Sequence, residues 1–424
     1  MQAIVNPGEV KGTIKAVPSK SMMQRACAAA LLHKGKTIIH NPGISEDDKA
    51  ALGIIQQLGA KVVFSDNKIE VISNGLVPLS DHIFCGESGL STRLFTPIAA
   101  LCNKSIRIDG SGSLLQRPMN ELGHILPELG VQVNNFTGKL PFTVQGPLQA
   151  KTIKIDGSVS SQYLSGLLFA YCFSATADVT IFVERLKSRP YIDMTLEVLT
   201  HFGRPVMNED YQAFHISPAL FTETEEISIT IEGDWSSAAV LLVAGAMAGD
   251  VTVEGLNIKS VQADKAILQV LKLADANIEE HEGKVRTVKS QLKEFEFDAT
   301  NCPDIFPIIS VLACCCNGES YIKGLHRLWH KESNRAQSIA EMLLQFNVFF
   351  SIENDVLCIN GGEGMWGSYI DSYNDHRIVM AASTGALQAD SKVIIDNAEA
   401  VNKSYPGFFE DLVSLGVFCS INKE

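Results

Sequence analysis

The sequence predicts an α/β protein of two similar lobes, each made of three repeated βαβαβ-type units. Two observations predict this fold class. An internal repeat recurs with a period of about seventy residues, and each repeat carries a helix of small apolar residues followed by a strand. A chain of 424 residues is also long for a single hydrophobic core, which favours two domains.

Six segments carry the repeat, and they share one order: a polar start, a small-residue helix, a polar or glycine break, and a strand. They start at Ser19, Ser88, Ser160, Ser236, Asp304 and Asp375. Successive starts are separated by 69, 72, 76, 68 and 71 residues. Such regularity indicates stacked copies of one supersecondary unit.

A second helix in each unit has Leu at helical spacing and usually ends at Gly. Examples are ALGIIQQLGAKVVF, ELGHILPELGVQV, TLEVLTHFGRPV, ILQVLKLADANI and FFEDLVSLGVF. Glycine is favoured where a helix ends in a left-handed residue, so a strand should follow each of these points. Every unit therefore reads as strand–helix–strand–helix–strand.

The domain boundaries follow from the repeat. We expect residues 13–231 to form the first lobe and residues 1–12 plus 232–424 to form the second, joined near Glu232–Asp234. The leading segment has no repeat of its own, so it should supply a strand to the second lobe. The chain would then cross twice between the lobes at a hinge.

Composition and charge narrow the function classes. The chain is 46% hydrophobic and 20% charged, which is typical of a soluble globular protein, and its net charge of −13 argues against nucleic acid or an anionic membrane as a partner. The apolar stretches 238–248 and 306–316 are too short to cross a bilayer. The start of the chain lacks the basic and apolar parts of a signal peptide, so we expect a cytoplasmic protein.

Ten cysteines raise the question of a metal site, and their spacing argues against one. None lies in a C-x-x-C pair, and Cys314, Cys315 and Cys316 are consecutive in an apolar run. Adjacent residues cannot all face one tetrahedral metal, so we expect small buried hydrophobes, no metal and no cofactor.

Helix starts in the first three repeats carry groups that suit anions. Lys20 and Ser21 open the first helix, and Arg25 lies on the same face as Ser21. Unpaired N–H groups and the positive dipole end make such positions suitable for phosphate and carboxylate, although a capping serine beside solvated charges is the alternative. Further candidates in these repeats are Gly89, Arg93, Arg117, Ser160, Ser161, Gln162 and Ser188.

The last three repeats add carboxylates. Gly233–Ser237 looks like another helix start, but no cation is near it in the sequence, so we interpret it as structural or as a hinge. Asp304 is predicted to begin a helix, and Lys331 and Arg335 would share a helix face beside Glu332. Two carboxylates among cations suit acid–base work on an anionic substrate; solvated ion pairing is the alternative. Arg377 and Lys403 are the candidates of the sixth repeat.

Ten short stretches, in order, carry a resemblance to a known family. They are SKSMMQRA, SGLSTR, QRPM, GSVSSQYLSGLL, SRPYIDMTLEVL, GDWSSAA, PDIFP, HKESNRA, YNDHRIVMA and NKSYPGFFEDL. From near Ser19 to near Leu412 the chain resembles the 5-enolpyruvylshikimate-3-phosphate synthase (3-phosphoshikimate 1-carboxyvinyltransferase) family. The resemblance implies the inside-out α/β enolpyruvyl transferase fold, with the active site in the cleft between the lobes.

The resemblance also implies a reaction. The enolpyruvyl group of phosphoenolpyruvate would pass to the 5-hydroxyl of shikimate 3-phosphate through a tetrahedral addition–elimination intermediate, with release of phosphate. This is a step of the shikimate pathway to chorismate and the aromatic amino acids. The two small molecules would be the partners of a monomeric enzyme.

Residue roles are implied position by position. The catalytic residues would be Asp304, Glu332 and Lys20, with Asp304 as the base and Glu332 or Lys20 as the proton donor. Shikimate 3-phosphate would contact Lys20, Ser21, Arg25, Ser160, Ser161, Ser188, Asp304 and Lys331. Phosphoenolpyruvate would contact Lys20, Gly89, Arg117, Gln162, Arg335, Arg377 and Lys403. Arg93 matches an arginine that shapes the loop of the second repeat and is not a direct ligand.

The chain departs from the family pattern at three places. The usual Asn-Ala-Gly-Thr loop is Glu87-Ser88-Gly89-Leu90, and Pro18 replaces the usual Gly before Ser-Lys-Ser. Before Lys331, Arg327 and Trp329 stand where the family commonly has Asn and Arg, so Arg327 could take over the missing charge.

Other function classes fit the sequence less well. A UDP-N-acetylglucosamine enolpyruvyl transferase would need a reactive cysteine in a Gly-rich loop, and Cys85, beside Phe84 and near Glu87, is a poor thiolate candidate. RNA 3′-phosphate cyclases use the same repeat, but the acidic charge disfavours RNA. A non-catalytic anion-binding relative would not need Asp304 and Glu332 together.

Overall fold

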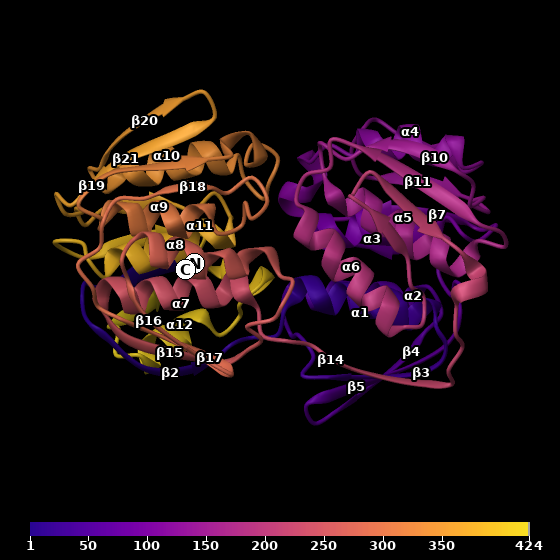
Figure 1. Ribbon diagram of the computed structural model, residues 1–424, viewed down its shortest axis with the longest axis horizontal. Coiled ribbons are helices and arrows are strands. Elements are labelled where there is room, and N and C mark those ends of the chain that lie inside the picture. Colours follow the sequence, from indigo (N-terminus) through magenta and orange to yellow (C-terminus); the bar gives the residue numbers. More distant parts are fainter. Residues whose placement is uncertain (423–424) are drawn as a thin grey trace. The chain divides into compact units, whose positions relative to one another are not determined.

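The structure is a computed structural model that describes residues 1–422. The chain divides into two compact units. In Figure 1, where colour follows the sequence, one unit is indigo to magenta, and the other is mainly orange to yellow and also contains the indigo N-terminal segment. The first lobe is Pro18–Ile231, and the second lobe is Met1–Val17 together with the chain from Glu232 onward. The division falls after Val17, not after residue 12, because Val10–Lys15 is one continuous strand that pairs with Gly249–Leu256 of the second lobe.

Each lobe contains three four-stranded sheets. In the first lobe their orders are β14-β3-β5-β4, β6-β7-β9-β8 and β10-β11-β13-β12. The strands are β3 (Lys34–His40), β4 (Lys61–Ser65), β5 (Lys68–Asn74), β6 (His82–Phe84), β7 (Ser105–Asp109), β8 (Gln132–Asn134), β9 (Phe142–Gln145), β10 (Ile153–Asp156), β11 (Val179–Glu184), β12 (Met207–Glu209), β13 (Ala213–Ile216) and β14 (Glu226–Thr230).

The second lobe repeats this plan with the orders β16-β17-β15-β2, β18-β19-β21-β20 and β22-β23-β1-β24. Its strands are β1 (Gln2–Val5), β2 (Val10–Lys15), β15 (Gly249–Leu256), β16 (Asn277–His281), β17 (Gly283–Val288), β18 (Glu296–Asp298), β19 (Gly318–Lys323), β20 (Phe349–Glu353), β21 (Val356–Gly361), β22 (Tyr369–Asp371), β23 (Val393–Asp396) and β24 (Cys419–Asn422).

One connection pattern generates the sheets. In the second repeat, β6 and β7 are parallel and joined by a helix, while β9 pairs antiparallel with both β7 and β8. The repeat is therefore βαβαββ, with one more strand than the sequence predicted. The N-terminal segment supplies β2 to the fourth repeat's sheet and β1 to the sixth, and β14 completes the first repeat's sheet from the far end of its lobe.

The first helix of each repeat is an inner helix. These are α1 (Lys20–Leu32), α3 (Gly89–Ala99), α5 (Ser161–Ser174), α7 (Trp235–Ala248), α9 (Phe306–Cys314) and α11 (His376–Ala386). Nearly all their residues are buried, because each inner helix packs against other helices on one side and against a sheet on the other. Small residues permit this packing: a Cβ added at Gly166 on α5 would lie 2.4 Å from the carbonyl oxygen of Arg93 on α3.

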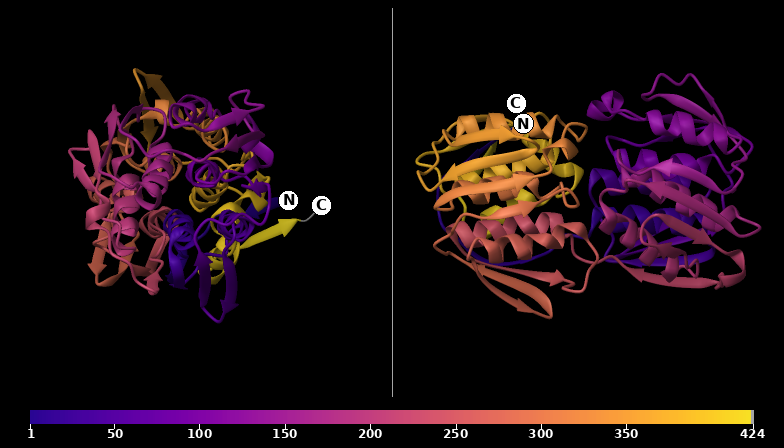
Figure 2. Two further views of the ribbon diagram at one scale, coloured as in Figure 1. Left: turned by 90° about the vertical axis from the view of Figure 1, so that its right-hand side faces the viewer. Right: turned by 45° about the horizontal axis from the view of Figure 1, so that its top comes forward.

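The second helix of each repeat has an exposed face. These outer helices are α2 (Glu46–Gln57), α4 (Asn120–Glu128), α6 (Arg189–His201), α8 (Ile267–Leu273), α10 (Arg335–Gln345) and α12 (Phe408–Ser414). Short 3₁₀ helices are η1 (Gly112–Gln116), η2 (Pro218–Leu220), η3 (Ala263–Ala266), η4 (Leu325–Arg327) and η5 (Ala398–Lys403). Figure 2 shows strands lying outside helices within each lobe. In residues 1–422, no helix has the length and apolar character needed to span a membrane.

Candidate active site

The three inner helices of the first lobe all begin at a neutral serine cap. The hydroxyls of Ser19, Ser88 and Ser160 accept hydrogen bonds from backbone N–H groups two or three residues later, at 3.2–3.4 Å. No acidic residue lies in the first turn of α1, α3 or α5. The positive dipole ends of these helices are therefore left for an external anion.

Side-chain hydrogen bonds hold these three helix starts together. The Gln24 side-chain oxygen on α1 accepts from the hydroxyls of Ser88 and Ser91, at 3.2 and 3.0 Å. Arg93 on α3 donates to the Gln162 side-chain oxygen of α5 at 2.9 Å and lies over the Tyr163 ring. Arg93 thus orients Gln162, which leaves the Gln162 amide N–H₂ group as the donor for a ligand.

Lys20 lies in the first turn of α1. Its ammonium group forms an ion pair with Asp47 of α2 at 3.0 Å, and its side chain is 15% exposed. The neighbouring Asp48 forms a capping box with Ser45 at the start of α2. Burial raises the pKa of the Asp48 carboxyl to about 6, although its hydrogen bonds to Ser45 lower it. The acidic start of α2 thereby holds Lys20 in place.

Arg25 lies deeper than the sequence suggested. It has no exposed surface, and its guanidinium donates to the Thr195 hydroxyl at 2.9 Å and to the carbonyl oxygens of Ser21 and Tyr191 at 2.8 and 3.1 Å. Burial lowers the pKa of Arg25 to about 10, so it stays charged at neutral pH. In this arrangement Arg25 braces Ser21 and α6, and a direct contact with a ligand stays a prediction.

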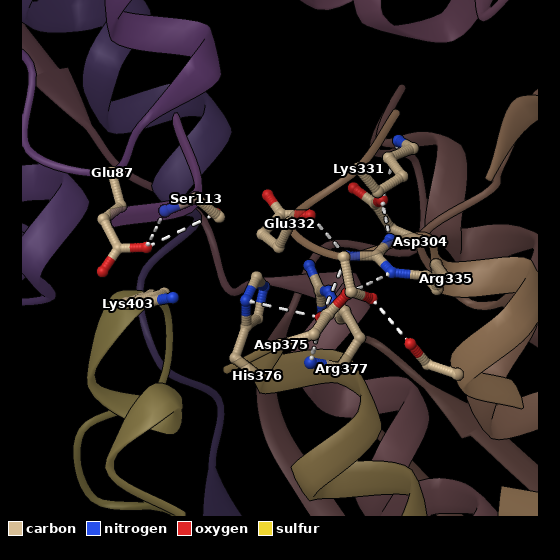
Figure 3. A network of polar contacts seen from close by, with 12 residues as sticks. Glu87, Ser113, Asp304, Lys331, Glu332, Arg335, Asp375, His376, Arg377 and Lys403 are labelled. Atoms are coloured by element: carbon tan, nitrogen blue, oxygen red, sulfur yellow. Dashed lines mark hydrogen bonds and ion pairs between the residues drawn. The ribbon is translucent and has the colours of Figure 1, made fainter. Parts of the chain in front are cut away.

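Gly89 opens α3 directly beside two guanidinium groups. A Cβ added there would lie 2.7 Å from Nη1 of Arg117 and 2.8 Å from Nη1 of Arg93. Glu87, the acidic residue of the unusual loop, accepts from the backbone N–H and hydroxyl of Ser113 at 3.3 and 3.4 Å (Figure 3). The loop before α3 is therefore tied to η1 at Ser113, four residues before Arg117.

The remaining first-lobe candidates surround the starts of α5 and α6. Ser161 is the first residue of α5 and is 3% exposed. Ser188 precedes α6 in a left-handed conformation, with φ 56° and ψ 45°, which is uncommon for serine. Together with Ser160 they place three hydroxyl side chains at two neighbouring helix starts.

In the second lobe two of the three corresponding caps are acidic. Asp234 accepts from the backbone N–H of Ser237 at the start of α7, and Asp375 accepts from that of Arg377 at the start of α11, at 2.7 and 2.9 Å. The sequence placed Asp304 at the start of a helix, but α9 begins at Phe306 with Ile305 as its cap. Asp304 lies in the turn before the helix, where its carboxylate can contact other elements.

Arg335 connects the carboxylates of this lobe (Figure 3). Its guanidinium donates to both oxygens of Asp375 at 2.9 and 3.1 Å, to Asp304 at 2.9 Å and to Glu332 at 2.5 Å. Its side chain is 1% exposed. Burial alone would lower its pKa, but Asp375, Glu332 and Asp304 outweigh burial and raise it, so Arg335 is permanently charged.

Lys331 and Glu332 reach this cluster differently from the sequence prediction. The helix α10 begins at Arg335 with Asn334 as its cap, so Lys331 and Arg335 do not share a helix face. Lys331 instead donates to Asp304 from the preceding loop, at 3.1 Å. The four residues Asp304, Lys331, Glu332 and Arg335 are together, as predicted, but hydrogen bonds and not helical spacing hold them.

The charges in the cluster decide the state of Asp304. Burial would raise the pKa of its carboxyl, but the positive charges of Lys331, Arg335 and Arg377 hold it well below its usual range. Asp304 is therefore ionised at neutral pH. A carboxylate in this state can accept a proton from a bound hydroxyl.

Arg377 has donors available for a ligand. It is 6% exposed, and its Nε and Nη1 are buried without a hydrogen-bond partner within residues 1–422. Burial opposes its charge, but Asp304, Asp234 and Asp264 raise its pKa. No cation is near Gly233–Ser237 in the sequence, but the fold brings Arg377 within electrostatic reach of Asp234. Lys403 donates to the carbonyl oxygen of Asn374 at 2.6 Å, just before α11.

Sequence reasoning assigned no role in the site to two acidic residues. Asp375, which holds Arg335, lies inside the recognised YNDHR stretch and could have been found there. Asp264 on η3 approaches Arg377 only through the fold, and nothing in its sequence surroundings marked it.

The cysteines offer no reactive thiol near this site. Burial raises the pKa of Cys85 to about 12, so its thiol stays protonated at neutral pH and cannot serve a cysteine-dependent enolpyruvyl transfer. Throughout the described part of the chain, no three side chains of His, Cys, Asp or Glu form a group suited to a metal ion.

Comparisons with known proteins agree with the resemblance. The family model for EPSP synthase (3-phosphoshikimate 1-carboxyvinyltransferase) matches residues 4–412. The chain is 34% identical to the 3-phosphoshikimate 1-carboxyvinyltransferase of Clostridium kluyveri, over 97% of this chain and 96% of that one. It is 35% identical to the same enzyme of Aeropyrum pernix, over 98% and 96% of the two chains.

Solved structures share the fold. EPSP synthase from Acinetobacter baumannii has a TM-score of 0.82 and 24% identity, over 99% of this chain and 100% of that one. The enolpyruvyl transferase NikO from Streptomyces tendae has a TM-score of 0.78 and 16% identity, over 99% and 98%. At these identities the likeness establishes the inside-out α/β fold alone.

Proposed function

The chain belongs to the EPSP synthase (3-phosphoshikimate 1-carboxyvinyltransferase) family, and from this premise we propose how its residues carry out the reaction. The protein is a transferase of aromatic amino acid biosynthesis: it moves the enolpyruvyl group of phosphoenolpyruvate to the 5-hydroxyl of shikimate 3-phosphate and releases phosphate. The observation that supports the residue roles best is that Asp304 and Glu332 both bind Arg335, while Arg377 has buried donors with no partner in residues 1–422.

The first step is an addition. Asp304 is held in its ionised form and accepts the proton of the 5-hydroxyl. At the same time, the oxygen of the 5-hydroxyl forms a bond to C2 of phosphoenolpyruvate. Glu332 or Lys20 delivers a proton to the methylene carbon, C3, so that it becomes a methyl group. The product is a tetrahedral intermediate in which C2 carries both the oxygen of the former 5-hydroxyl and the phosphate.

The second step is an elimination. The bond between C2 and the phosphate oxygen breaks, the methyl carbon returns a proton to the group that delivered it, Glu332 or Lys20, and the C2–C3 double bond forms again. Phosphate departs with the electron pair, and no electron acceptor or donor is needed. We propose that the reaction requires neither a metal nor a cofactor, because both substrates' charges are matched by Lys and Arg side chains.

The two substrates use different sets of side chains. Phosphoenolpyruvate is held by Lys20, Gly89, Arg117, Gln162, Arg335, Arg377 and Lys403. Shikimate 3-phosphate is held by Lys20, Ser21, Ser160, Ser161, Ser188, Asp304 and Lys331. Arg25 is also predicted to contact shikimate 3-phosphate, and its bond to the Ser21 carbonyl supports this second set.

One assay tests the function. Phosphate release from phosphoenolpyruvate should depend on added shikimate 3-phosphate and should continue at the same rate after exhaustive chelation. Absence of release would reject the function, and a rate restored by one divalent metal would reject the metal-free mechanism. We also propose that the enzyme is a cytoplasmic monomer, which size-exclusion chromatography and cell fractionation would check.

The assignment of the two sets is tested at Arg377. Arg377→Ala should raise the KM for phosphoenolpyruvate about ten- to a hundredfold, since a charge-assisted contact is worth about 1.5–3 kcal/mol, and should change the KM for shikimate 3-phosphate far less. Arg286→Ala is the control, because Arg286 pairs with Asp250 and Glu279 on the sheet surface. Equal effects on both KM values would show that the assignment is wrong.

A further inference from the structure

Asp264 is a buried carboxylic acid that the proposed mechanism does not use. It lies on η3, is 2% exposed, and accepts a hydrogen bond from the Ser236 hydroxyl in the first turn of α7. Its other oxygen, Oδ1, is buried and has no hydrogen-bond partner in residues 1–422. An unpaired carboxylate oxygen in this position is costly if the group is charged.

The other acids of the cluster are better paired. Asp375 accepts from the Arg335 guanidinium and from a backbone N–H, and Asp304 accepts from both Lys331 and Arg335. Glu332 is paired with Arg335, and Asp234 accepts a backbone N–H at its helix cap. Within residues 1–422 the Asp264 carboxyl accepts one hydrogen bond, from a neutral hydroxyl, so its unpaired oxygen gains from a proton.

Charged groups from three neighbouring segments act on Asp264. Asp234 approaches from α7, Asp304 from the turn before α9, and Arg377 from α11. Burial first, and then Asp304, raise the pKa of Asp264 to about 7, while Arg377 and Ser236 act the other way. The thiol of Cys302 also faces it and stays protonated, and Lys265 on the same short helix donates to the Ile258 carbonyl oxygen instead.

Arg377 is the cation that Asp264 and a ligand would share. The unpaired Nε and Nη1 of Arg377 are available to an anion, but an ionised Asp264 attracts the same guanidinium. An arriving phosphate or carboxylate adds negative charge beside Asp264 and so favours its neutral form. Binding of the anion and binding of the proton are therefore linked.

We propose that Asp264 is a positioning residue for the phosphoenolpyruvate site, which takes up a proton when this anion binds and thereby leaves the Arg377 guanidinium to the ligand. The inference rests on the proposed assignment of Arg377 to phosphoenolpyruvate. Asp264 touches neither substrate in this account; it acts through Arg377. Its sequence signal is absent because the charge of Arg377 acts on Asp264 only in the folded lobe.

Calorimetry tests the proton directly. Phosphoenolpyruvate is titrated into the enzyme without shikimate 3-phosphate at pH 8, in buffers of low and high ionisation enthalpy. We expect uptake of about half a proton or more per bound ligand for the unchanged enzyme and none for Asp264→Asn, which mimics the protonated side chain. The matched control is Asp275→Asn, since Asp275 is 61% exposed and pairs with Lys293. Unchanged uptake in Asp264→Asn would overturn the inference.

The pH profile gives a readout that a merely structural role would not move. With saturating shikimate 3-phosphate, kcat/KM for phosphoenolpyruvate should fall about three- to tenfold between pH 7 and pH 9, because ionised Asp264 competes for Arg377. Asp264→Asn should lack this fall. Ser236→Ala removes the hydroxyl that favours the ionised form, so its fall should begin at higher pH. A fall that is the same in all three proteins would reject the inference.

Thermal unfolding detects a folding defect in the variants and distinguishes failure of the proposed enzyme function from failure of the proposed role of Asp264. The ordinary pKa of the Asp264 carboxyl is 3.8, and the fold raises it, so ionisation disfavours the folded state. The stability of Asp264→Asn relative to the unchanged protein should therefore increase from about pH 4 to about pH 7 and then stay level. If the enzyme released no phosphate, the function would fail, while calorimetry and unfolding would still decide the role of Asp264.

Discussion

Arg335 shows how one buried residue sets the state of several others. Its guanidinium contacts Asp375, Glu332 and Asp304 at once, and the last of these is the proposed base. Because Lys331 adds a second bond to Asp304, the carboxylate has two cationic partners and a pKa well below its usual range. Asp304 should thus remain a base throughout the physiological pH range.

Asp304→Asn tests this residue's role. The amide keeps the shape and some hydrogen bonding but cannot accept a proton, so turnover should fall at least about a hundredfold, the low end for general base catalysis. Binding of shikimate 3-phosphate should change only a few-fold. Calorimetry for binding and phosphate release for turnover would measure both.

Glu332→Gln is the companion variant. Turnover should again fall more than binding, and less than in Asp304→Asn, since Lys20 can share proton delivery. Normal turnover of Asp304→Asn would show that Asp304 only holds Lys331 and Arg335 in place.

Gly89 gives a second test at the residue scale. A methyl group there would lie 2.7 Å from the Arg117 guanidinium, so Gly89→Ala should displace Arg117 and raise the KM for phosphoenolpyruvate about tenfold or more. Gly53→Ala is the matched control, because a Cβ at this position in helix α2 meets nothing within 4 Å. Steady-state kinetics measure the effect; a KM that stays the same would mean that Arg117 does not hold the ligand.

Site residues could be predicted from the sequence where a local motif marks them, and not where the fold alone brings them in. Lys20, Gly89 and Arg377 lie in helix starts that the sequence identifies. Asp264 and the deep position of Arg25 depend on contacts across elements far apart in the chain, such as the bond between Arg25 and Thr195. No local pattern encodes those contacts.

At the scale of elements, the two lobes use the same inner helices with opposite caps. Serine caps in the first lobe leave the helix dipoles to attract anions, whereas Asp234 and Asp375 in the second lobe offset the dipoles and attract cations instead. We therefore expect the first lobe to bind anions through helix ends and the second to bind them through arginines near its acidic caps.

Changing one cap tests this difference. Ser160→Asp keeps a good cap for α5 but adds a negative charge, so the KM for shikimate 3-phosphate should rise about tenfold or more, equivalent to about 1.4 kcal/mol. Ser160→Asn is the control, since asparagine caps equally well without charge. Thermal unfolding should be alike in both variants. If the two variants had the same KM, the charge at the cap would be irrelevant to binding.

The boundaries of helices and strands, like the site residues, could be predicted where a local motif marks them. Ser and Asp caps predicted where five of the inner helices begin, because capping is a local interaction. The sequence misplaced Lys331 on a helix because Asn334, an equally good cap, delays α10 to Arg335. It missed the extra strand of the second and third repeats because β8 and β12 are only three residues long, too short for a clear alternation.

At the scale of the molecule, the repeat predicted the fold because the number of sequence repeats equals the number of structural units, three in each lobe. It also predicted that the leading segment belongs with the second lobe, although this segment supplies two strands, and β1 pairs with both β23 and β24. The first lobe has a hydrophobic core of its own, whose buried residues run from Met23 to Ile231. Each lobe should therefore respond separately to a defect in its core.

Val5→Asp tests this independence. Val5 lies in β1, has no exposed surface, and pairs with Val393 and Cys419 of the two neighbouring strands. An unpaired charge there should cost the second lobe about 3 kcal/mol or more, since nothing in the sheet can compensate it. Calorimetry should then show two unfolding transitions, and limited proteolysis should leave a fragment near residues 18–231. Gly8→Asp, an exposed change in the same segment, should unfold like the unchanged protein. Loss of both lobes in one transition would show that the first lobe depends on the second for its stability.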